Sequence, residues 1–329
     1  MTRTQRSIST LLLACAGAAL GLTGAAAAQG HFPSKPITLI VPFAPGGIAD
    51  ITARAVAREM SASLGQPVVV DNRPSAGSIV ASIAVAQAAP DGHTLLLVSN
   101  GHAVSASLFK GLPFDVQKDF APVGTLGFFD LVLVVGQESR FKTLGDLLGF
   151  AKANPGKLTI GTIAVGSTQH LSAELFKSVA GIDAVVVPYK TSPAVITALR
   201  SGEIDLGFEI LGPTLPQISG KALRALAVTS DKRFTPALPD VPTVQEAGVA
   251  PYNVASWNAL AVPARTPKEV VEKLNRAANA ALAVPAVQQQ LQALGVRAQG
   301  GTPGQMQALL AAEIQRWAGV ISTAKVERQ

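Results

Sequence analysis

The alternation of short apolar runs with helix-length segments constrains the fold of this 329-residue chain more than any other feature. The strand candidates are residues 37–43, 67–72, 94–99, 131–136, 157–163, 183–189, 204–210, 223–230 and 256–262. Most are continuous runs of Val, Ile and Leu without polar alternation, which is typical of parallel strands covered on both faces. The pattern therefore predicts an α/β fold, with mostly parallel sheets flanked by helices.

Apolar stripes at helical spacing fill the gaps between these strands. After Ser167, apolar residues recur every four positions at Leu171, Leu175 and Val179. Two further stripes are formed by Val270, Val271, Leu274, Ala277, Ala278 and Ala281, and by Met306, Leu310, Ile314, Trp317 and Ile321. A single apolar face on a helix indicates packing against a core, so we interpret these stripes as structural and not as cofactor sites.

The order of the elements predicts two lobes. Two runs of strand–helix units are separated by segments that we expect to cross between the lobes, at 124–135 and near 253–263. The chain then leaves the first lobe, builds the second and returns. On this interpretation the first lobe comprises 29–127 plus 256–329, and the second comprises 128–255.

The N-terminal 28 residues have the pattern of a signal peptide. Arg3 and Arg6 precede an apolar run at 11–22, and small residues follow up to Ala28. This predicts cleavage near Ala28 and export of the rest of the chain. A membrane anchor is disfavoured because the run is shorter than the roughly 20 residues that a spanning helix needs. Lipidation of Cys15, in a loose lipoprotein-like box, stays open.

Composition after cleavage excludes several classes of protein. Cys15 is the only cysteine, so the mature chain has no thiol for a disulfide, a cysteine metal site or cysteine catalysis. The formal net charge of +6 falls to +4 when Arg3 and Arg6 are removed. Since no block of Lys or Arg is present, we expect no nucleic-acid partner, whereas an anionic small ligand fits the mild positive charge.

Catalytic and metal-binding motifs are missing from the sequence. The four histidines, His31, His93, His102 and His170, have no metal-ligand spacing. There is no G-x-S-x-G elbow, Walker loop or G-x-G-x-x-G fingerprint. We therefore assign no catalytic residue, metal or cofactor. A cleft enzyme whose carboxylates meet only in the folded chain remains an alternative.

Turns rich in Gly, Ser and Thr follow several of the predicted strands. They lie at 43–50, 73–82, 99–107, 161–170 and 189–195. Open α/β sheets bind ligands at the carboxyl edges of their strands, where helix N-termini offer unpaired N–H groups to a carboxylate. Each turn also has a purely structural explanation: Gly46 and Gly47 permit a tight turn, Asp50 caps it, and Ser167 or Thr168 is an N-cap.

Three side chains near these turns have two explanations each. His170 follows "GSTQ" early in a helix, where it either reaches a ligand or bonds the neighbouring loop. Lys190 comes after Tyr189 at a strand end and is a candidate partner for an anion. Glu209 ends another strand, where it either accepts from a ligand donor or holds a loop.

Several blocks of the sequence together resemble one family. They are "FPSKPITLIVPFAPGGIADITARAVA", "LGQPVVVDNRPSAGS", "AAPDGHTLLLVSN", "STQHLSAELFKSVAG", "VPYK", "LRALAVTSDKR", "PALPDVPTVQEAG" and the "GTP" before the last helix. In this order, from about Phe32 to Trp317, they resemble the Bug-type receptors of tripartite tricarboxylate transporters.

The resemblance implies a two-lobed periplasmic-binding-protein fold of type II, the Venus-flytrap kind. It also implies a receptor that closes over an organic acid or amino-acid-like ligand, with the loops 43–48 and 163–168 clasping a carboxylate. The candidate ligand-binding set is then Phe43, Ala44, Pro45, Gly46, Gly47, Ile48, Ser78, Asn100, Ile163, Ala164, Ser167, Thr168, His170, Lys190, Thr191 and Glu209.

This chain departs from the family pattern within the proposed clasp. Ala44 stands where the family usually has Pro, 163–165 is Ile-Ala-Val in place of small polar residues, 77–81 is Gly-Ser-Ile-Val-Ala, and Thr191 replaces a Gly. Loss of glycine restricts the approach of backbone to a ligand, and loss of hydroxyls removes donors. We therefore infer a drier pocket, suited to a ligand with one carboxylate and an apolar or aromatic body.

The resulting hypothesis is a monomeric solute receptor that works by hinge closure. Ligand binding would favour the closed form, which membrane transporter subunits then recognise. Alternatively, a membrane sensor kinase recognises the closed form. A third possible function is that of an enzyme with its active site in the cleft. No nucleic-acid partner is expected.

Overall fold

The computed structural model of the protein describes residues 32–329. The predicted signal peptide, its cleavage site and Cys15 lie outside the described residues. Residues 35–329 form one compact unit. None of the helices in the described range has the length and apolar character that crossing a membrane requires.

The first sheet has the strand order β2-β1-β3-β9-β4. Its members are β1 (Ile37–Val41), β2 (Val68–Asn72), β3 (Thr94–Ser99), β4 (Phe120–Gly136) and β9 (Ala255–Pro263), and the short β10 (Val296–Ala298) also pairs with β4. β1 runs parallel to β2 and β3, whereas β9 is antiparallel to both β3 and β4. The carboxyl ends of β1, β2 and β3 therefore share one edge.

The second sheet continues from β4 in the order β4-β7-β5-β6, with β8 also paired to β4. Its strands are β5 (Leu158–Ile163), β6 (Ala184–Tyr189), β7 (Leu206–Ile210) and β8 (Leu223–Val228). β5 is parallel to β6 and β7, and β4 is antiparallel to β7 and β8. The outer strands of each sheet are thus parallel, and the antiparallel pairs gather around β4 and β9.

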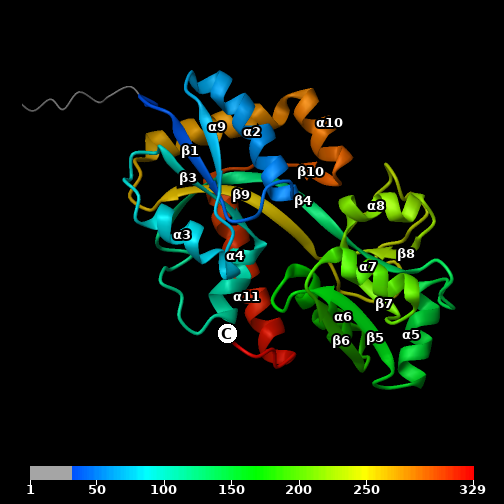
Figure 1. Cartoon of the computed structure of the whole chain (residues 1–329). Coiled ribbons are helices and arrows are strands. Elements are labelled where there is room, and N and C mark those ends of the chain that lie inside the picture. Colours follow the sequence, from blue (N-terminus) through cyan, green and yellow to red (C-terminus); the bar gives the residue numbers. More distant parts are fainter. Residues whose placement is uncertain (1–31) are drawn as a thin grey trace, which may run out of the picture. The chain divides into compact units, whose positions relative to one another are not determined.

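β4 is the strand that takes part in both sheets. Its residues 120–130 pair with β9, and its residues 131–136 pair with β7 and β8. We call the first sheet with its helices the first lobe, and the second sheet with its helices the second lobe (Figure 1). The lobe boundaries 29–127 plus 256–329 and 128–255 remain a prediction.

Helices cover both faces of each sheet. In the first lobe, α2 (Ile48–Leu64), α9 (Lys268–Ala283) and α10 (Pro285–Ala293) lie on one face, and α3 (Ile79–Ala86), α4 (Asn100–Leu108) and α11 (Pro303–Thr323) on the other (Figure 1). A single 3₁₀ turn, η1 (Ala76–Ser78), precedes α3. In the second lobe, α5 (Leu144–Ala153) and α6 (Thr168–Ala180) lie opposite α7 (Ser192–Ser201) and α8 (Leu211–Ser219).

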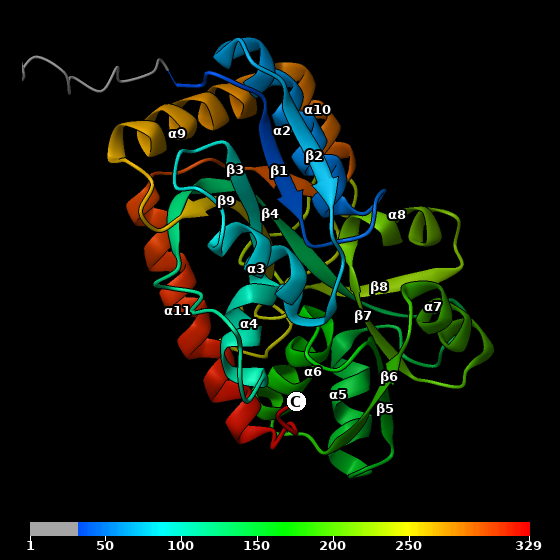
Figure 2. The ribbon, with the colours of Figure 1, turned by 60° about the vertical axis from the view of Figure 1, so that its left-hand side comes forward.

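The apolar stripes predicted from the sequence face the core. All six residues of the α9 stripe are buried, and so are Met306, Leu310, Trp317 and Ile321 of α11. In α6, Leu171 is buried and the other two stripe residues pack against the same cluster. The C-terminal part of α11 reaches α6 of the second lobe (Figure 2), so this core extends across both lobes.

Every strand candidate corresponds to a strand of the structure, which confirms the α/β class. Two strand segments were not predicted. β4 begins at Phe120, eleven residues before the predicted run, and β10 is a three-residue strand. The early part of β4 contains Pro122, Gly124 and Gly127, and its pairing with β9 shifts register there, so it lacks the uninterrupted apolar pattern of the other strands.

Candidate functional site

The turn between β1 and α2 is the first half of the predicted clasp. Residues 44–47 are exposed, and Gly46 has φ of +85°, a left-handed conformation that favours glycine. A Cβ at Gly46 would meet nothing within 4 Å, so the backbone conformation and not the available space demands glycine. The turn leaves its own backbone open to solvent immediately before a 17-residue helix.

A buried carboxylate holds this turn in place. Asp50, 3% exposed, accepts hydrogen bonds from Gly46 N at 2.9 Å, Asn72 Nδ2 at 2.9 Å and Arg54 Nε at 3.0 Å. Asn72 Nδ2 also donates to Phe43 O at 3.0 Å. Burial raises the pKa of Asp50, but the bonds from Arg54, Gly46 and Asn72 outweigh it and hold the pKa below its ordinary value. Asp50 therefore fixes the loop, and the N–H of Gly46 is already used.

The N-terminus of α2 has no side-chain cap. Its N-cap is Gly47, which offers no acceptor to the first turn. The first N–H groups of an α-helix have no partner within the helix, and together they carry partial positive charge. Ile51 N donates to Gly47 O at 2.9 Å, so the backbone N–H groups of residues 48–50, which have no hydrogen-bond partner within the described chain, are available to an external acceptor such as a carboxylate.

The turn between β5 and α6 is the second half of the predicted clasp. It makes more hydrogen bonds within itself than the first turn does. Ser167 is the N-cap: its Oγ accepts from His170 N at 3.1 Å and donates to Ile163 O at 3.1 Å. Ser167 N also donates to Ala164 O at 3.0 Å. Ala164 and Val165 are exposed at the tip. A side-chain acceptor already occupies the first turn of α6, in contrast to α2.

The second turn packs against α4 of the first lobe. A Cβ on Gly166 would lie 2.2 Å from Leu108 Cδ2, so glycine permits this close approach. Nearby, Asn100 Nδ2 donates to Thr168 Oγ1 at 2.9 Å, and Trp317 Nε1 donates to Asn100 Oδ1 at 2.7 Å. Asn100 and Trp317 are buried. This chain of hydrogen bonds, which we call the lobe bridge, connects α11, α4 and α6. Asn100 and Thr168 are therefore brought together, each bonded to the other.

The edge of the second sheet contributes a buried carboxyl group. Glu209, 1% exposed, accepts from Ser192 Oγ through Oε2 at 2.6 Å, while its Oε1 has no hydrogen-bond partner among the described residues. Burial raises the pKa of Glu209 to about 7, and the bonds from Ser192 and the Ile210 N–H oppose the shift only in part. Lys190 and Thr191, on the neighbouring turn, are exposed, and Thr191 caps α7 by accepting from Ala194 N at 3.4 Å.

Two other predicted residues have local partners. Ser78 is buried with φ of +60°, its N–H donates to Ser75 O at 3.1 Å, and its carbonyl accepts from Ser82 Oγ at 2.9 Å. His170 is also buried, its Nδ1 has no partner in the described chain, and burial lowers its pKa. His170 lines a cavity of about 510 Å³ with Val165, Glu174, Val186, Pro188 and the C-terminal residues.

Buried polar side chains that we did not predict lie at the same sheet edges. Asn258 on β9 is 1% exposed, is in register with Ser99 at the end of β3, and has no partner for either amide atom among residues 32–329. In the second lobe Gln169 is buried, and its Nε2 likewise has no described partner. A polar residue inside the apolar run "SWNALAV" was the one available signal for Asn258.

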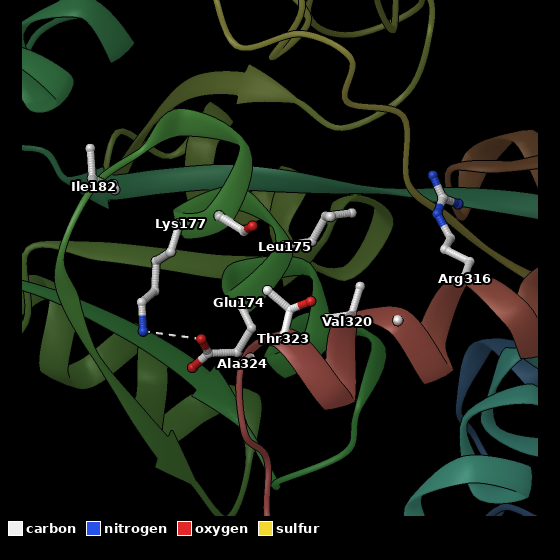
Figure 3. A pocket seen from close by; sticks show the side chains of 10 residues that line it. Glu174, Leu175, Lys177, Ile182, Arg316, Val320, Thr323 and Ala324 are labelled. Carbon is white, nitrogen blue, oxygen red and sulfur yellow. Dashed lines mark hydrogen bonds and ion pairs between the residues drawn. The ribbon is translucent and has the colours of Figure 1, made fainter.

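A separate groove lies between α6 and α11 (Figure 3). It has a volume of about 550 Å³, and Lys177 pairs there with Glu174 at 3.0 Å. None of its lining residues lies in 43–48 or 163–170, so it is distinct from the predicted clasp. Within residues 32–329, no three His, Cys, Asp or Glu side chains come together as a metal site.

The fold and the site define a class of protein. Two α/β lobes joined by a shared strand, with strand-to-helix turns at their carboxyl edges, are the architecture of periplasmic solute-binding proteins. Among solved structures, the chain is similar to an R. palustris protein, Rpa4515, solved with adipate, at 36% identity and a TM-score of 0.79, covering 89% of this chain and 98% of that one. It is also similar to MatC from Rhodopseudomonas palustris with bound malate, at 32% identity and a TM-score of 0.75, covering 88% of this chain and 100% of MatC.

The family follows from the sequence comparisons. Residues 52–326 match the model of the tripartite tricarboxylate transporter family receptor, TctC. The chain is 39% identical over 316 residues to protein BugT of Bordetella pertussis, covering 95% of this chain and 97% of that protein. The chain belongs to the tripartite tricarboxylate transporter receptor family, which confirms the predicted resemblance and the two-lobed fold.

Proposed function

We propose that this receptor is exported to the periplasm, captures a small organic acid between its two lobes, and presents it to the membrane subunits of a tripartite tricarboxylate-type transporter. The solved relatives hold adipate and malate, both dicarboxylates, which supports a carboxylate-bearing ligand. The family is one of receptors, which supports binding without turnover.

The observation that carries this proposal is the uncapped N-terminus of α2. Asp50 fixes the turn from within while residues 44–47 stay exposed, so the helix offers N–H groups that need no rearrangement before they bind an anion. A charge-assisted hydrogen bond from such a group to a carboxylate contributes about 1.5–3 kcal/mol. We assign the anchoring of the ligand carboxylate to this turn, Phe43 to Ile48.

The turn from Ile163 to Thr168 completes the clasp from the second lobe. Because its first N–H groups are partly satisfied by Ser167, its main contribution is closure, through the contact of Gly166 with Leu108 and the lobe bridge to Asn100. The exposed Lys190 and Thr191 extend the same edge. The aliphatic residues 163–165 favour a ligand with one carboxylate and an apolar or aromatic body.

The identity of the ligand is the test of this function. Native mass spectrometry of the purified receptor should detect a bound organic acid, and a thermal-shift panel should show stabilisation by related acids. Recovery of a chemically altered product would favour an enzyme. If only small dicarboxylates stabilise the protein, the expected ligand with one carboxylate is wrong, but the receptor function still holds.

Closure itself is measured by small-angle scattering. The bound acid should lower the radius of gyration, since the ligand is expected to bind the closed form more tightly than the open one. An unchanged radius in the presence of a ligand confirmed by mass spectrometry would count against hinge closure.

A further inference from the structure

The position of Glu209 places a buried carboxyl group beside the second half of the clasp. β7 runs parallel to β5, with Leu206 opposite Ile160 and Gly207 opposite Gly161, and the two strands end at Ile210 and Ile163. On its other side Glu209 pairs with Val132 of β4. Glu209 is thus at the carboxyl edge of the second sheet, the edge at which β5 ends in Ile163 and the turn 163–168 begins.

The surroundings of Glu209 do not satisfy its charge. Val132 and Ile163 belong to an apolar cluster with Val195 and Leu211, and no described Lys, Arg or His makes an ion pair with either carboxyl oxygen. Ser192 donates to Oε2 and the Ile210 N–H also stabilises the carboxylate, whereas Oε1 has no hydrogen-bond partner among residues 32–329. An acidic side chain that is 1% exposed and half-partnered is costly, because an unsatisfied buried oxygen loses its hydration without compensation.

A purely structural role explains only half of this arrangement. Holding the start of α7 through Ser192 needs a single acceptor, and a neutral Gln would supply it without a buried charge. No hydrogen bond within the part of the chain that the structure describes accounts for Oε1. Buried titratable groups with perturbed pKa at a sheet edge are characteristic of functional sites.

We propose that Glu209 is a specificity-determining residue whose free oxygen accepts a hydrogen bond from a hydroxyl or ammonium group of the bound acid. This inference rests on the proposed receptor function and narrows its ligand class: the acid carries a hydrogen-bond donor in addition to the carboxylate held at α2. A site that offers a buried acceptor rejects analogues that lack the donor, because the acceptor is then left unpaired.

Matched pairs of acids test this inference by calorimetry. The pairs are malate with succinate, aspartate with succinate, and 4-hydroxybenzoate with benzoate, each differing by one donor. The intact receptor should bind at least one donor-bearing acid about tenfold or more tightly than its partner. In Glu209→Leu, which removes both oxygens and keeps an apolar side chain of similar size, the ratio within the pair should fall to near unity.

Ser192→Ala is the matched control, because it removes the internal hydrogen bond and leaves Oε1 in place. It should preserve the preference for the donor-bearing acid. If Glu209→Leu weakens the affinity for both acids of a pair by the same factor, Glu209 has a structural role and the inference is overturned. The inference is also overturned if the intact receptor binds acids but shows no preference for those with a donor. If no acid binds and no acid co-purifies with the receptor, the proposed receptor function itself is overturned.

Discussion

The two turns of the clasp are alike in sequence position and different in chemistry. Each follows a parallel strand, carries a left-handed glycine, Gly46 or Gly166, and starts a long helix. The turn before α2 is fixed from inside by Asp50 and leaves its helix N-terminus uncapped. The turn before α6 is capped by Ser167 and bonded to the first lobe through Thr168.

From this difference we propose that the two lobes have different roles in ligand binding. An uncapped helix end held by a buried carboxylate is prepared for an anion before the ligand arrives, so it suits the anchoring step. A turn that satisfies part of its own N–H groups and contacts the opposite lobe suits the closing step. The family resemblance implied that both turns clasp a carboxylate, and these contacts do not require the two turns to contribute in the same way.

Removal of the Asp50 side chain should have the largest effect on the first turn. Asp50→Ala leaves Gly46 N without its acceptor, removes one of the two acceptors of Asn72 Nδ2, and leaves Arg54 bonded only to Asn72 Oδ1. We expect a loss of about 3 kcal/mol in the free energy of unfolding, measured by urea titration, together with loss of acid binding.

Asp146→Ala provides the matched control, since Asp146 occupies the same third position of its helix, α5, but is exposed. It should lower stability less and leave ligand binding unchanged. If both variants behave alike, Asp50 is an ordinary helix-capping residue and does not support the site.

The buried carboxyl group beside the second turn should make stability depend on pH. The pKa of Glu209 rises from 4.5 to about 7 on folding, so the folded state binds the proton more tightly. The stabilisation is therefore complete below about pH 4.5 and is lost as the pH rises toward about 7, by roughly 3 kcal/mol in total.

Comparison with Glu209→Gln isolates this contribution in the ligand-free protein. Burial lowers the pKa of His170, so its contribution has the opposite sign, but it is the same in both proteins and cancels in the difference. Urea titrations between pH 4.5 and 8 should show the variant gaining stability relative to the parent as the pH rises. A constant difference across this range would mean that Glu209 does not titrate there.

Breaking the lobe bridge should have a smaller effect, which is limited to the equilibrium between open and closed forms. Thr168→Val keeps the size of the side chain and removes the acceptor for Asn100, a bond that joins the first lobe to the second. At about 1 kcal/mol, its loss should shift the ligand-free receptor toward more open forms, seen as a larger radius of gyration in scattering.

Ser167→Ala tests whether any change in this turn has the same result. It removes the helix cap, at a cost of about 1 kcal/mol in stability, without touching the bridge. The radius of the ligand-free protein should then stay at the parent value. Equal expansion in both variants would show that the turn acts through helix stability and not through the bridge.

Most strands were predictable because each one is a short, continuous apolar run, including the edge strands β2 and β6, which are only partly buried. The first part of β4 was not, since Pro122, Gly124 and Gly127 interrupt it and its pairing depends on β9, which lies more than a hundred residues later in the chain. β10 has three residues, "VRA", and too short a pattern to recognise.

The candidate site was predictable as a set of turns and less so as a set of contacts. Gly46 and Ser167 could be placed on turns from their local sequence. The bond between Trp317 and Asn100 joins residues 217 positions apart, and the bond between Asn100 and Thr168 joins residues 68 apart. No local pattern contains that information, so the lobe bridge could not be predicted from the sequence.

The most direct measurement of the central claim uses proline at the first position of α2. Ile48→Pro removes one backbone N–H, and proline is tolerated at this position because that N–H has no partner within the helix. Gly47 already has the extended conformation that a residue before proline prefers, with φ of −79° and ψ of 168°. Ile48→Ala keeps the N–H and accounts for the lost side chain.

Calorimetry with the acid that gives the largest thermal shift then shows whether the ligand carboxylate binds the N–H of Ile48. If the N-terminus of α2 anchors the carboxylate, Ile48→Pro should bind roughly 10- to 100-fold more weakly than Ile48→Ala, with similar unfolding free energies for the two variants. Equal affinity of the two variants would contradict the claim, because the ligand would then not use the N–H that the uncapped helix provides.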